Sequence, residues 1–194
     1  MARRPRPFTS INSAALERCG VTGLDVVVRL EGSTLTIVGG DGGAVAISAA
    51  SVDLIRQFST QTVHSPDGDI PPLYETKIWW DGRPKPALLI PVEDHSAYCA
   101  AIAGFAGQVA AAHGLERLRI GPGYVTAIVN LLLVGIPCLF LFAYVLGIAM
   151  MDGGWWWPAA VAIVIAFAWL ARRNLVSRWP RAVRSLDQFV AELA

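Results

Sequence analysis

The sequence lacks most of the residue patterns by which active sites are recognised. Its 194 residues include three cysteines and three histidines. Cys19, Cys99 and Cys138 show neither zinc-finger spacing nor a C-x-x-C pair, so we expect reduced, mostly packed thiols. The histidines lack the H-x-x-x-H spacing of a metal site, and neither a G-x-S-x-G motif nor a phosphate loop occurs. We therefore expect no catalytic residue, no metal, no cofactor and no enzyme activity.

The chain also lacks a strong net charge of either sign. The formal net charge is +1 at pH 7, so overall charge gives no reason to expect a nucleic-acid partner. The basic start of the chain is not followed by an apolar run, which argues against a secretory signal. We expect residues 1–20 to be a flexible basic segment. It contains a short helix capped by Ser10 or Ser13, running through Arg18 and ended by Gly20.

Two loops carry residues that could bind ligands, but neither has a complete binding pattern. The glycines of 39–43 lack a following Lys and Ser or Thr, and they join strand to strand. No helix amino terminus is therefore offered to a phosphate, and we do not expect nucleotide binding there. His64, Asp67 and Asp69 could hold a cation weakly, although a solvated loop is the favoured interpretation.

Residues 21–114 show the pattern of a small α+β domain. Alternating apolar residues, separated by turn-forming residues, predict a meander of short strands. The predicted strands are 24–30, 34–38, 44–47, 52–58, 74–80 and 87–92. From Glu93 to His113 the period becomes helical, with Tyr98, Ile102, Phe105 and Val109 on one stripe. We expect this helix to cover the open end of an antiparallel sheet.

The order of these elements resembles the bacterial pleckstrin-homology-like (PH-like) domains. The resemblance is carried by short apolar segments and by the closing helix that ends near Val109. The segments are Leu35-Thr36-Ile37, Val52-Asp53-Leu54-Ile55-Arg56, Ile78-Trp79-Trp80 and Leu88-Leu89-Ile90-Pro91. The resemblance implies a domain that binds partners and that has seven strands. Because the pattern shows six, Ser59 to Val63 is the candidate for the seventh.

After the linker 115–123, the chain has one long stretch almost without charge. Two apolar runs, 124–151 and 155–173, flank a turn at 152–154, and Asp152 is the only charged residue between Tyr124 and Ala171. A helix needs roughly 20 apolar residues to cross a bilayer, so the runs predict a transmembrane helical hairpin. A chain of this length is too short to bury two such helices on all sides, which argues against a soluble alternative.

Basic residues flank the predicted hairpin on both sides. They are Arg117, Arg119, Arg172, Arg173, Arg178, Arg181 and Arg184. Because basic residues favour the cytoplasmic side, we expect a bacterial inner-membrane protein with two spans and both termini in the cytoplasm. The residues expected at the membrane interface are Trp155, Trp156, Trp157, Arg172, Arg173 and Trp179.

Few side chains inside the predicted spans suggest a specific role. Small or polar residues suited to contact between membrane helices are Asn130, Gly135, Ala162 and Ala166, and Pro137 is expected to kink the first span. Asp, Glu, Lys, Arg and His are absent from Tyr124 to Met151 and from Trp155 to Ala171, which argues against an ion or proton carrier acting alone.

The tail, 174–194, contains a second helical stripe. Pro180 suits the first turn of a helix, and Val183, Leu186, Val190 and Leu193 follow at helical spacing. An amphipathic helix at the membrane interface and a helix packed on the domain or on a partner subunit are equally consistent with this pattern.

The predicted domain offers several residues for contact with a partner. Trp79 and Trp80 alternate in direction, so one is expected in the core and the other outside. Arg83 and Lys85 share a turn and are candidates for contact with anionic lipid headgroups or a partner, although ordinary turn charge is the favoured interpretation. Arg29, Arg56 and Lys77 are the other expected surface cations.

These features favour a non-enzymatic membrane protein whose PH-like domain is an interaction or assembly module. It would contact the bilayer and other membrane subunits, or self-associate, as an accessory subunit of a larger complex. The alternative is a homo-oligomeric channel or transport component in which the first span lines the path.

Overall fold

The computed structural model describes residues 5–60, 68–69, 71–151, 158, 161–162, 164–166, 168–169, 172 and 179–193. The chain divides into two compact units. Unit 1 comprises Met1–Gly121 and Arg181–Ala194, and unit 2 comprises Pro122–Pro180. The chain therefore leaves unit 1, forms unit 2, and returns to unit 1 with its last residues.

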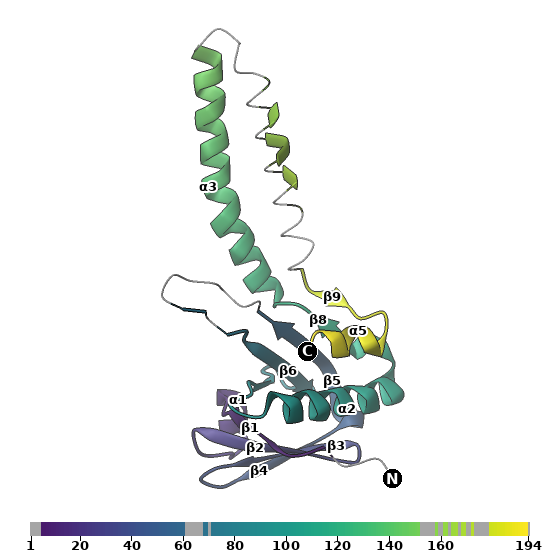
Figure 1. The fold of residues 1–194 in the computed structure, drawn as a ribbon. Helices are drawn as coiled ribbons and strands as arrows, with labels where there is room; N and C mark the ends of the chain where they lie inside the picture. The colour runs from purple at the N-terminus through teal and green to yellow at the C-terminus, as the bar shows by residue number, and fades with distance from the viewer. Residues whose placement is uncertain are drawn as a thin grey trace. The chain divides into compact units, whose positions relative to one another are not determined.

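The first sheet of unit 1 has four antiparallel strands in the order β1-β2-β3-β4 (Figure 1). Their bounds are β1 Phe8–Ile11, β2 Asp25–Glu31, β3 Thr34–Gly39 and β4 Ala44–Ser48. The short helix α1, Ala14–Glu17, follows β1 and has Ser13 as its N-cap. β1 lies within the amino-terminal residues that were expected to be flexible, and that prediction was wrong for this segment.

The second sheet has five strands in the order β7-β6-β5-β8-β9. Their bounds are β5 Val52–Ser59, β6 Tyr74–Trp80, β7 Ala87–Leu89, β8 Leu118–Ile120 and β9 Arg181–Ala182. β5 and β8 are parallel, and the other neighbours are antiparallel. Short 3₁₀ turns, η1 Ala49–Ser51 and η2 Leu115–Arg117, precede β5 and β8. The two sheets meet where Ser10 bridges to Pro91.

Helix α2, His95–His113, packs on the sheets with the predicted stripe inward. Asp94 is its N-cap, and its carboxylate accepts hydrogen bonds from Ala97 N at 2.9 Å and from Ser96 Oγ at 2.7 Å. The stripe residues Tyr98, Ile102, Phe105 and Val109 are each 0% exposed, which confirms the helical pattern. They form one hydrophobic core with the inward residues of both sheets.

The carboxy-terminal tail is part of this core. Helix α5, Leu186–Ala191, follows β9, and Phe189 and Leu193 are fully buried. The Leu193 carbonyl accepts a hydrogen bond from the Cys99 thiol at 3.0 Å, and Ser59 Oγ donates to Glu192 Oε1 at 3.2 Å. Of the two alternatives left open by the sequence, the structure shows the tail packed on the domain.

The expected fold class, a single meander capped by one helix, was wrong. The described residues form two sheets with nine strands. Three of these strands lie in segments predicted as flexible terminus, linker and tail, namely β1, β8 and β9. They have two to four residues each, which is too short for a clear alternating pattern, and they are defined by their hydrogen-bonded neighbours.

The prediction of a transmembrane hairpin also requires correction. In unit 2, α3 runs from Tyr124 to Met151 and contains Pro137. Within the part of the chain that the structure describes, no helix combines the length and the apolar character needed to cross a membrane. This finding contradicts the predicted hairpin and the predicted two-span inner-membrane location with cytoplasmic termini.

The glycine-rich connection between β3 and β4 has a structural role that yields a stability prediction. Gly43 has φ +76°, and a Cβ added there would lie 1.8 Å from the carbonyl oxygen of Gly20. We expect Gly43→Ala to lower the free energy of unfolding by about 2–4 kcal/mol, because backbone strain and a steric clash add. Chemical denaturation measures this change.

Gly32→Ala is the matched control for that substitution. Gly32 also has a positive φ of +62°, but a Cβ there would meet nothing within 4 Å. We expect it to cost about 1–2 kcal/mol from the backbone alone. Equal losses at the two positions would show that the contact with Gly20 does not matter.

Candidate functional site

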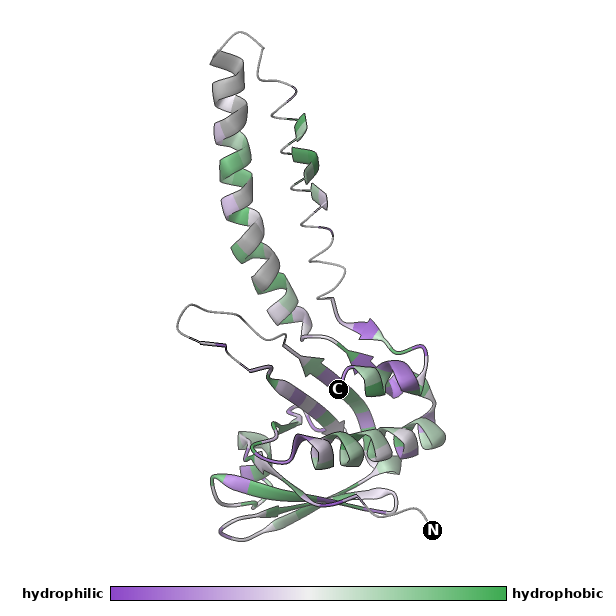
Figure 2. Ribbon diagram, in the orientation of Figure 1, coloured by the Kyte–Doolittle hydropathy of each residue, from purple (hydrophilic) through white to green (hydrophobic). Residues whose placement is uncertain are grey.

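The outer face of the second sheet combines cationic, aromatic and aliphatic side chains. Along β5 and β6, buried and partly exposed residues alternate, with Ile55, Gln57, Thr76 and Ile78 directed inward. Figure 2 shows hydrophilic and hydrophobic positions along the same strands. The outer face is defined by the partly exposed residues Leu54, Arg56, Phe58, Glu75, Lys77, Trp79, Leu88 and Arg119.

Three cations of the outer face form a row across three adjacent strands. Arg56 on β5 is directly opposite Arg119 on β8 and directly opposite Lys77 on β6. Like charges directly opposite one another on a sheet repel, so the row concentrates positive charge at one place on the outer face. The Lys77 ammonium forms an ion pair with Glu75 at 2.5 Å, which offsets part of the charge.

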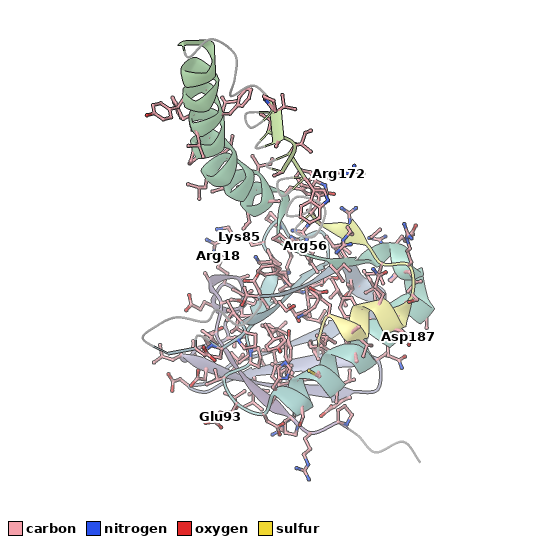
Figure 3. All side chains as sticks on the ribbon, turned by 45° about the horizontal axis from the view of Figure 1, so that its top comes forward. Arg18, Arg56, Lys85, Glu93, Arg172 and Asp187 are labelled. Atoms are coloured by element: carbon pink, nitrogen blue, oxygen red, sulfur yellow. The ribbon has the colours of Figure 1, made fainter. Side chains whose placement is uncertain are left out.

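An aromatic side chain lies next to this cation row. The Arg56 guanidinium carbon is 5.1 Å from the centre of the Trp79 ring, a cation–π arrangement. Trp79 is partly exposed, whereas Trp80 is 1% exposed and lies in the core. The prediction that the two tryptophans point to opposite sides is confirmed. The Trp79 ring supports the Arg56 side chain and restricts its orientation (Arg56 is labelled in Figure 3).

The start of β5 is fixed by contacts between charged groups and the backbone. Arg117 Nη1 donates to the Asp53 carbonyl oxygen at 2.8 Å and lies 3.8 Å from the Asp53 carboxylate. Asp53 Oδ2 accepts a hydrogen bond from Gly82 N at 2.7 Å. Asp53 occupies the irregular register position between Val52 and Leu54. These contacts join β5 to the segments before β8 and after β6, and so position the strands that carry the row.

Arg83 contacts Trp80 and Cys19. The Arg83 guanidinium carbon is 5.0 Å from the centre of the Trp80 ring, on the side of β6 opposite Trp79. Arg83 Nη1 donates to the Cys19 sulfur at 2.6 Å. Lys85 and Arg18 are both exposed, and both are labelled in Figure 3. Arg83 and Trp79 therefore lie on opposite sides of β6, and a contact of Trp79, Arg83 and Lys85 with a partner stays a prediction.

Beneath the outer face, the inward side of the sheet holds a buried polar network. Thr76 Oγ1 donates to Gln57 Oε1 at 2.5 Å and lies 2.6 Å from the Tyr98 hydroxyl, and that hydroxyl also donates to Gln57 at 3.1 Å. Burial raises the pKa of Tyr98 to about 12, with the two hydrogen bonds acting in the opposite direction. The neutral phenol is therefore the form that the fold stabilises.

This raised pKa predicts a loss of stability at high pH. An unfolded tyrosine titrates near pH 10.0 and folded Tyr98 near 12, so the folded state retains its proton longer. The contribution is complete below about pH 10 and is lost as the pH rises towards 12. We expect the free energy of unfolding of the wild type to fall more steeply over this window than that of Tyr98→Phe. Denaturant titrations at several pH values measure both slopes, and equal slopes would contradict the assignment.

A cysteine and a histidine also come together on α2. The Cys99 sulfur lies 3.5 Å from His95 Nε2, and the His95 ring stacks at 3.9 Å between centroids on Tyr74. Burial raises the pKa of the Cys99 thiol, which donates its proton to the Leu193 carbonyl. A nucleophilic cysteine requires a stabilised thiolate, so this arrangement favours a packing role. His95 and Cys99 are four residues apart on the predicted helix, and this spacing could have shown from the sequence that the two side chains are neighbours.

The residues predicted to contact membrane helices lie in unit 2. In α3, Gly135 and Pro137 are exposed, and Asn130 belongs to the helix although its side chain lies outside the described residues. Ala162 and Ala166 are helical and exposed.

The residues predicted for the membrane interface are only partly described. Arg172 is exposed and is labelled in Figure 3. Trp179 is 37% exposed, and its ring meets that of Tyr124 edge to face at 5.9 Å between centroids. This contact joins the two ends of unit 2. The remaining predicted positions, Trp155, Trp156, Trp157 and Arg173, lie outside the described residues.

Comparisons with known proteins identify no relative. No family model, curated protein or solved structure matches the chain.

Sequence reasoning named two members of the cation row but not the row itself. Arg56 and Lys77 were expected to be surface cations, whereas Arg119 was interpreted as a basic flank of an apolar run. Their alignment depends on the parallel pairing of β5 with β8, and no local pattern in the sequence encodes that pairing. The alternation within Val52–Phe58 and Tyr74–Trp80 was the only signal that these cations share a face.

Proposed function

We propose that unit 1 is a non-enzymatic interaction domain that binds an acidic segment of a partner protein on the outer face of the second sheet. The observation that supports this proposal is the cation row formed by Arg119, Arg56 and Lys77. A carboxylate-rich segment laid across the three strands would be attracted by the positive charge that the row concentrates there. Arginine suits this role because its planar guanidinium can form two parallel hydrogen bonds with one carboxylate.

The apolar residues of the outer face support a protein partner rather than a small anion. Trp79 lies beside Leu54, its partner on β5, and Leu88 lies opposite Lys77 on β7. Interfaces between proteins are enriched in tryptophan and arginine, and a few such residues carry most of the binding energy. Because Trp79 already holds Arg56, less conformational freedom is lost when a partner binds.

The order of elements in unit 1 supports the same proposal through the PH-like resemblance. Within the described residues, seven strands, β1 to β7, precede the closing helix α2. β1, Phe8–Ile11, would supply the strand that the sequence pattern lacked. Residues 61–63 of the candidate segment Ser59 to Val63 lie outside the described residues. Domains of the PH-like type usually bind partners, so the resemblance and the cation row point to one class of function. The proposed domain would act as an accessory module in a larger complex.

A charge reversal at the centre of the row tests the proposal. The probe is a fluorescein-labelled ten-residue peptide of alternating Glu and Leu, titrated with the full-length chain and followed by fluorescence anisotropy. We expect Arg56→Glu to weaken binding about tenfold or more, because it removes one attractive contact and adds repulsion. We also expect the affinity of the wild type to fall as salt is raised.

Arg29→Glu is the matched control for that charge reversal. Arg29 is exposed on β2 in the other sheet, and its replacement changes the net charge of the chain by the same amount. We expect it to leave binding of the peptide within about twofold of the wild type. Equal losses for the two variants would show a general charge effect and would refute the proposed site.

A further inference from the structure

The edge strand of the first sheet, β4, has no neighbouring strand on one side among the described residues. The sheet order is β1-β2-β3-β4, and among the residues that the structure describes β4 pairs only with β3 (Figure 1). An edge strand presents unpaired backbone donors and acceptors, and another strand can pair with them unless they are covered or blocked.

Two hydrogen bonds at the ends of the β3–β4 pair fix which residues face β3. Gly39 N donates to the Gly43 oxygen at 3.0 Å, and Ala49 N donates to the Ser33 oxygen at 2.8 Å. In an antiparallel pair, hydrogen-bonded positions alternate with positions whose backbone groups point away from the neighbour. Gly43 and Ala49 are both bonded to the β3 side, and every second residue between them has the same orientation. The backbone groups of Val45 and Ile47 therefore face β3.

The intervening residues direct their backbone groups away from the sheet. Ala44, Ala46 and Ser48 thus offer N–H and C=O groups along the open side of β4. The Ser48 oxygen already accepts a hydrogen bond from Ser51 Oγ at 3.1 Å. A carbonyl oxygen has two lone pairs, so it can still accept a second bond.

The open side of β4 has none of the features that usually prevent pairing. Its sequence, Ala-Val-Ala-Ile-Ser, contains no charged residue and no proline. One edge strand of the second sheet, β7, is protected by its short length and its flanking residues. It has three residues and is flanked by Lys85, Pro86 and Pro91. Its Leu88 N–H donates to Ser13 Oγ at 3.4 Å.

We propose that β4 pairs antiparallel with β4 of a second copy of this chain, about a two-fold axis at Ala46. The two first sheets would then form one continuous sheet with four strands from each copy. This surface is distinct from the outer face of the second sheet, so the proposal does not depend on the proposed function.

The composition of β4 favours a second copy over a different partner. In the register centred on Ala46, Ala46 lies opposite its equivalent, and Ala44 lies opposite Ser48. These pairs are small and neutral, so close approach meets neither bulk nor like charge. On the inward face, partly exposed Val45 would lie opposite Ile47 of the second copy and extend the apolar core. A self-complementary surface of this kind is what a two-fold dimer requires.

Opposite charges placed on the axis test the proposal with the full-length chain. Sedimentation velocity is expected to show a dimer for the wild type. It is expected to show at least a tenfold larger dissociation constant for Ala46→Lys alone and for Ala46→Glu alone, because like charges meet at the axis. Mixing the two variants is expected to restore the dimer. Gln108→Lys, at an exposed position on α2, is expected to leave the dimer unchanged.

A proline variant separates loss of pairing from loss of folding. The Ala46 N–H points away from β3, so Ala46→Pro removes a bond to the second copy without removing a bond to β3. We expect a monomer with the circular dichroism spectrum of the wild type. The proposal is overturned if the wild type is monomeric at about 100 μM, if mixing the charged variants fails to restore the dimer, or if folded Ala46→Pro remains dimeric.

Discussion

Replacing Phe189 with alanine is expected to lower the free energy of unfolding of unit 1 by about 3–5 kcal/mol. Phe189 is 0% exposed and lies on α5. It is close to the carboxy terminus, whereas most residues of the core that it packs in come from earlier parts of the chain. Its removal would leave a cavity beneath α2, where Gly107 is close to Leu186 of α5. The loss is large because the surrounding sheets cannot collapse fully into the space.

Val190→Ala is the matched control for this substitution. Val190 is the next residue on α5 and is 38% exposed, so its side chain contributes less apolar burial. We expect a loss of less than about 1 kcal/mol, within the usual range for surface positions. Guanidinium denaturation of both variants measures the difference. If Phe189→Ala costs no more than Val190→Ala, the tail is not a part of the core of unit 1.

The second large effect is expected at the outer face of the second sheet. Trp79→Ala should weaken binding of the acidic Glu-Leu peptide by about thirtyfold, which corresponds to roughly 2 kcal/mol. The substitution removes the apolar contact area of the ring and also releases Arg56, which the ring now orients at 5.1 Å. Fluorescence anisotropy with the full-length chain gives the ratio of dissociation constants.

A double-mutant cycle shows whether Trp79 acts partly through Arg56. If the ring orients the guanidinium, the losses from Trp79→Ala and Arg56→Ala should sum to more than the loss in the double variant. Trp79→Phe retains a ring and should recover part of the affinity. Strictly additive losses would contradict a coupled pair. If Trp79→Ala bound the peptide as tightly as the wild type, the outer face would not be the binding surface.

The regular elements of unit 1 followed from local patterns. Tyr74 to Trp80 was predicted as a strand, and β6 has these bounds. The helical stripe of Tyr98, Ile102, Phe105 and Val109 is buried as the spacing required. In both cases burial of alternate or helically spaced residues dominates the energetics, so the spacing of apolar residues is enough to predict the type of secondary structure.

The missed elements depend on contacts between distant parts of the chain. β8 and β9 have three and two residues, and each exists because a neighbouring strand supplies its hydrogen bonds. No local period distinguishes Leu118–Ile120 from a linker. The cation row has the same origin, since Arg119 reaches Arg56 only through this pairing. Apolar composition was equally insufficient in 124–151 and 155–173, where it predicted membrane spans that the described residues do not show.

Site-specific photo-crosslinking from position 79 tests the central claim most directly. A photoreactive phenylalanine analogue replaces Trp79 in the full-length chain, in cells that make the protein, and the crosslinked segments are identified by mass spectrometry. The same analogue at position 29, on the other sheet, is the control. The proposed interaction domain predicts crosslinks from position 79, absent from position 29, to a protein segment rich in Asp and Glu. Crosslinks that are the same from both positions, or that join position 79 to segments without acidic residues, would contradict it.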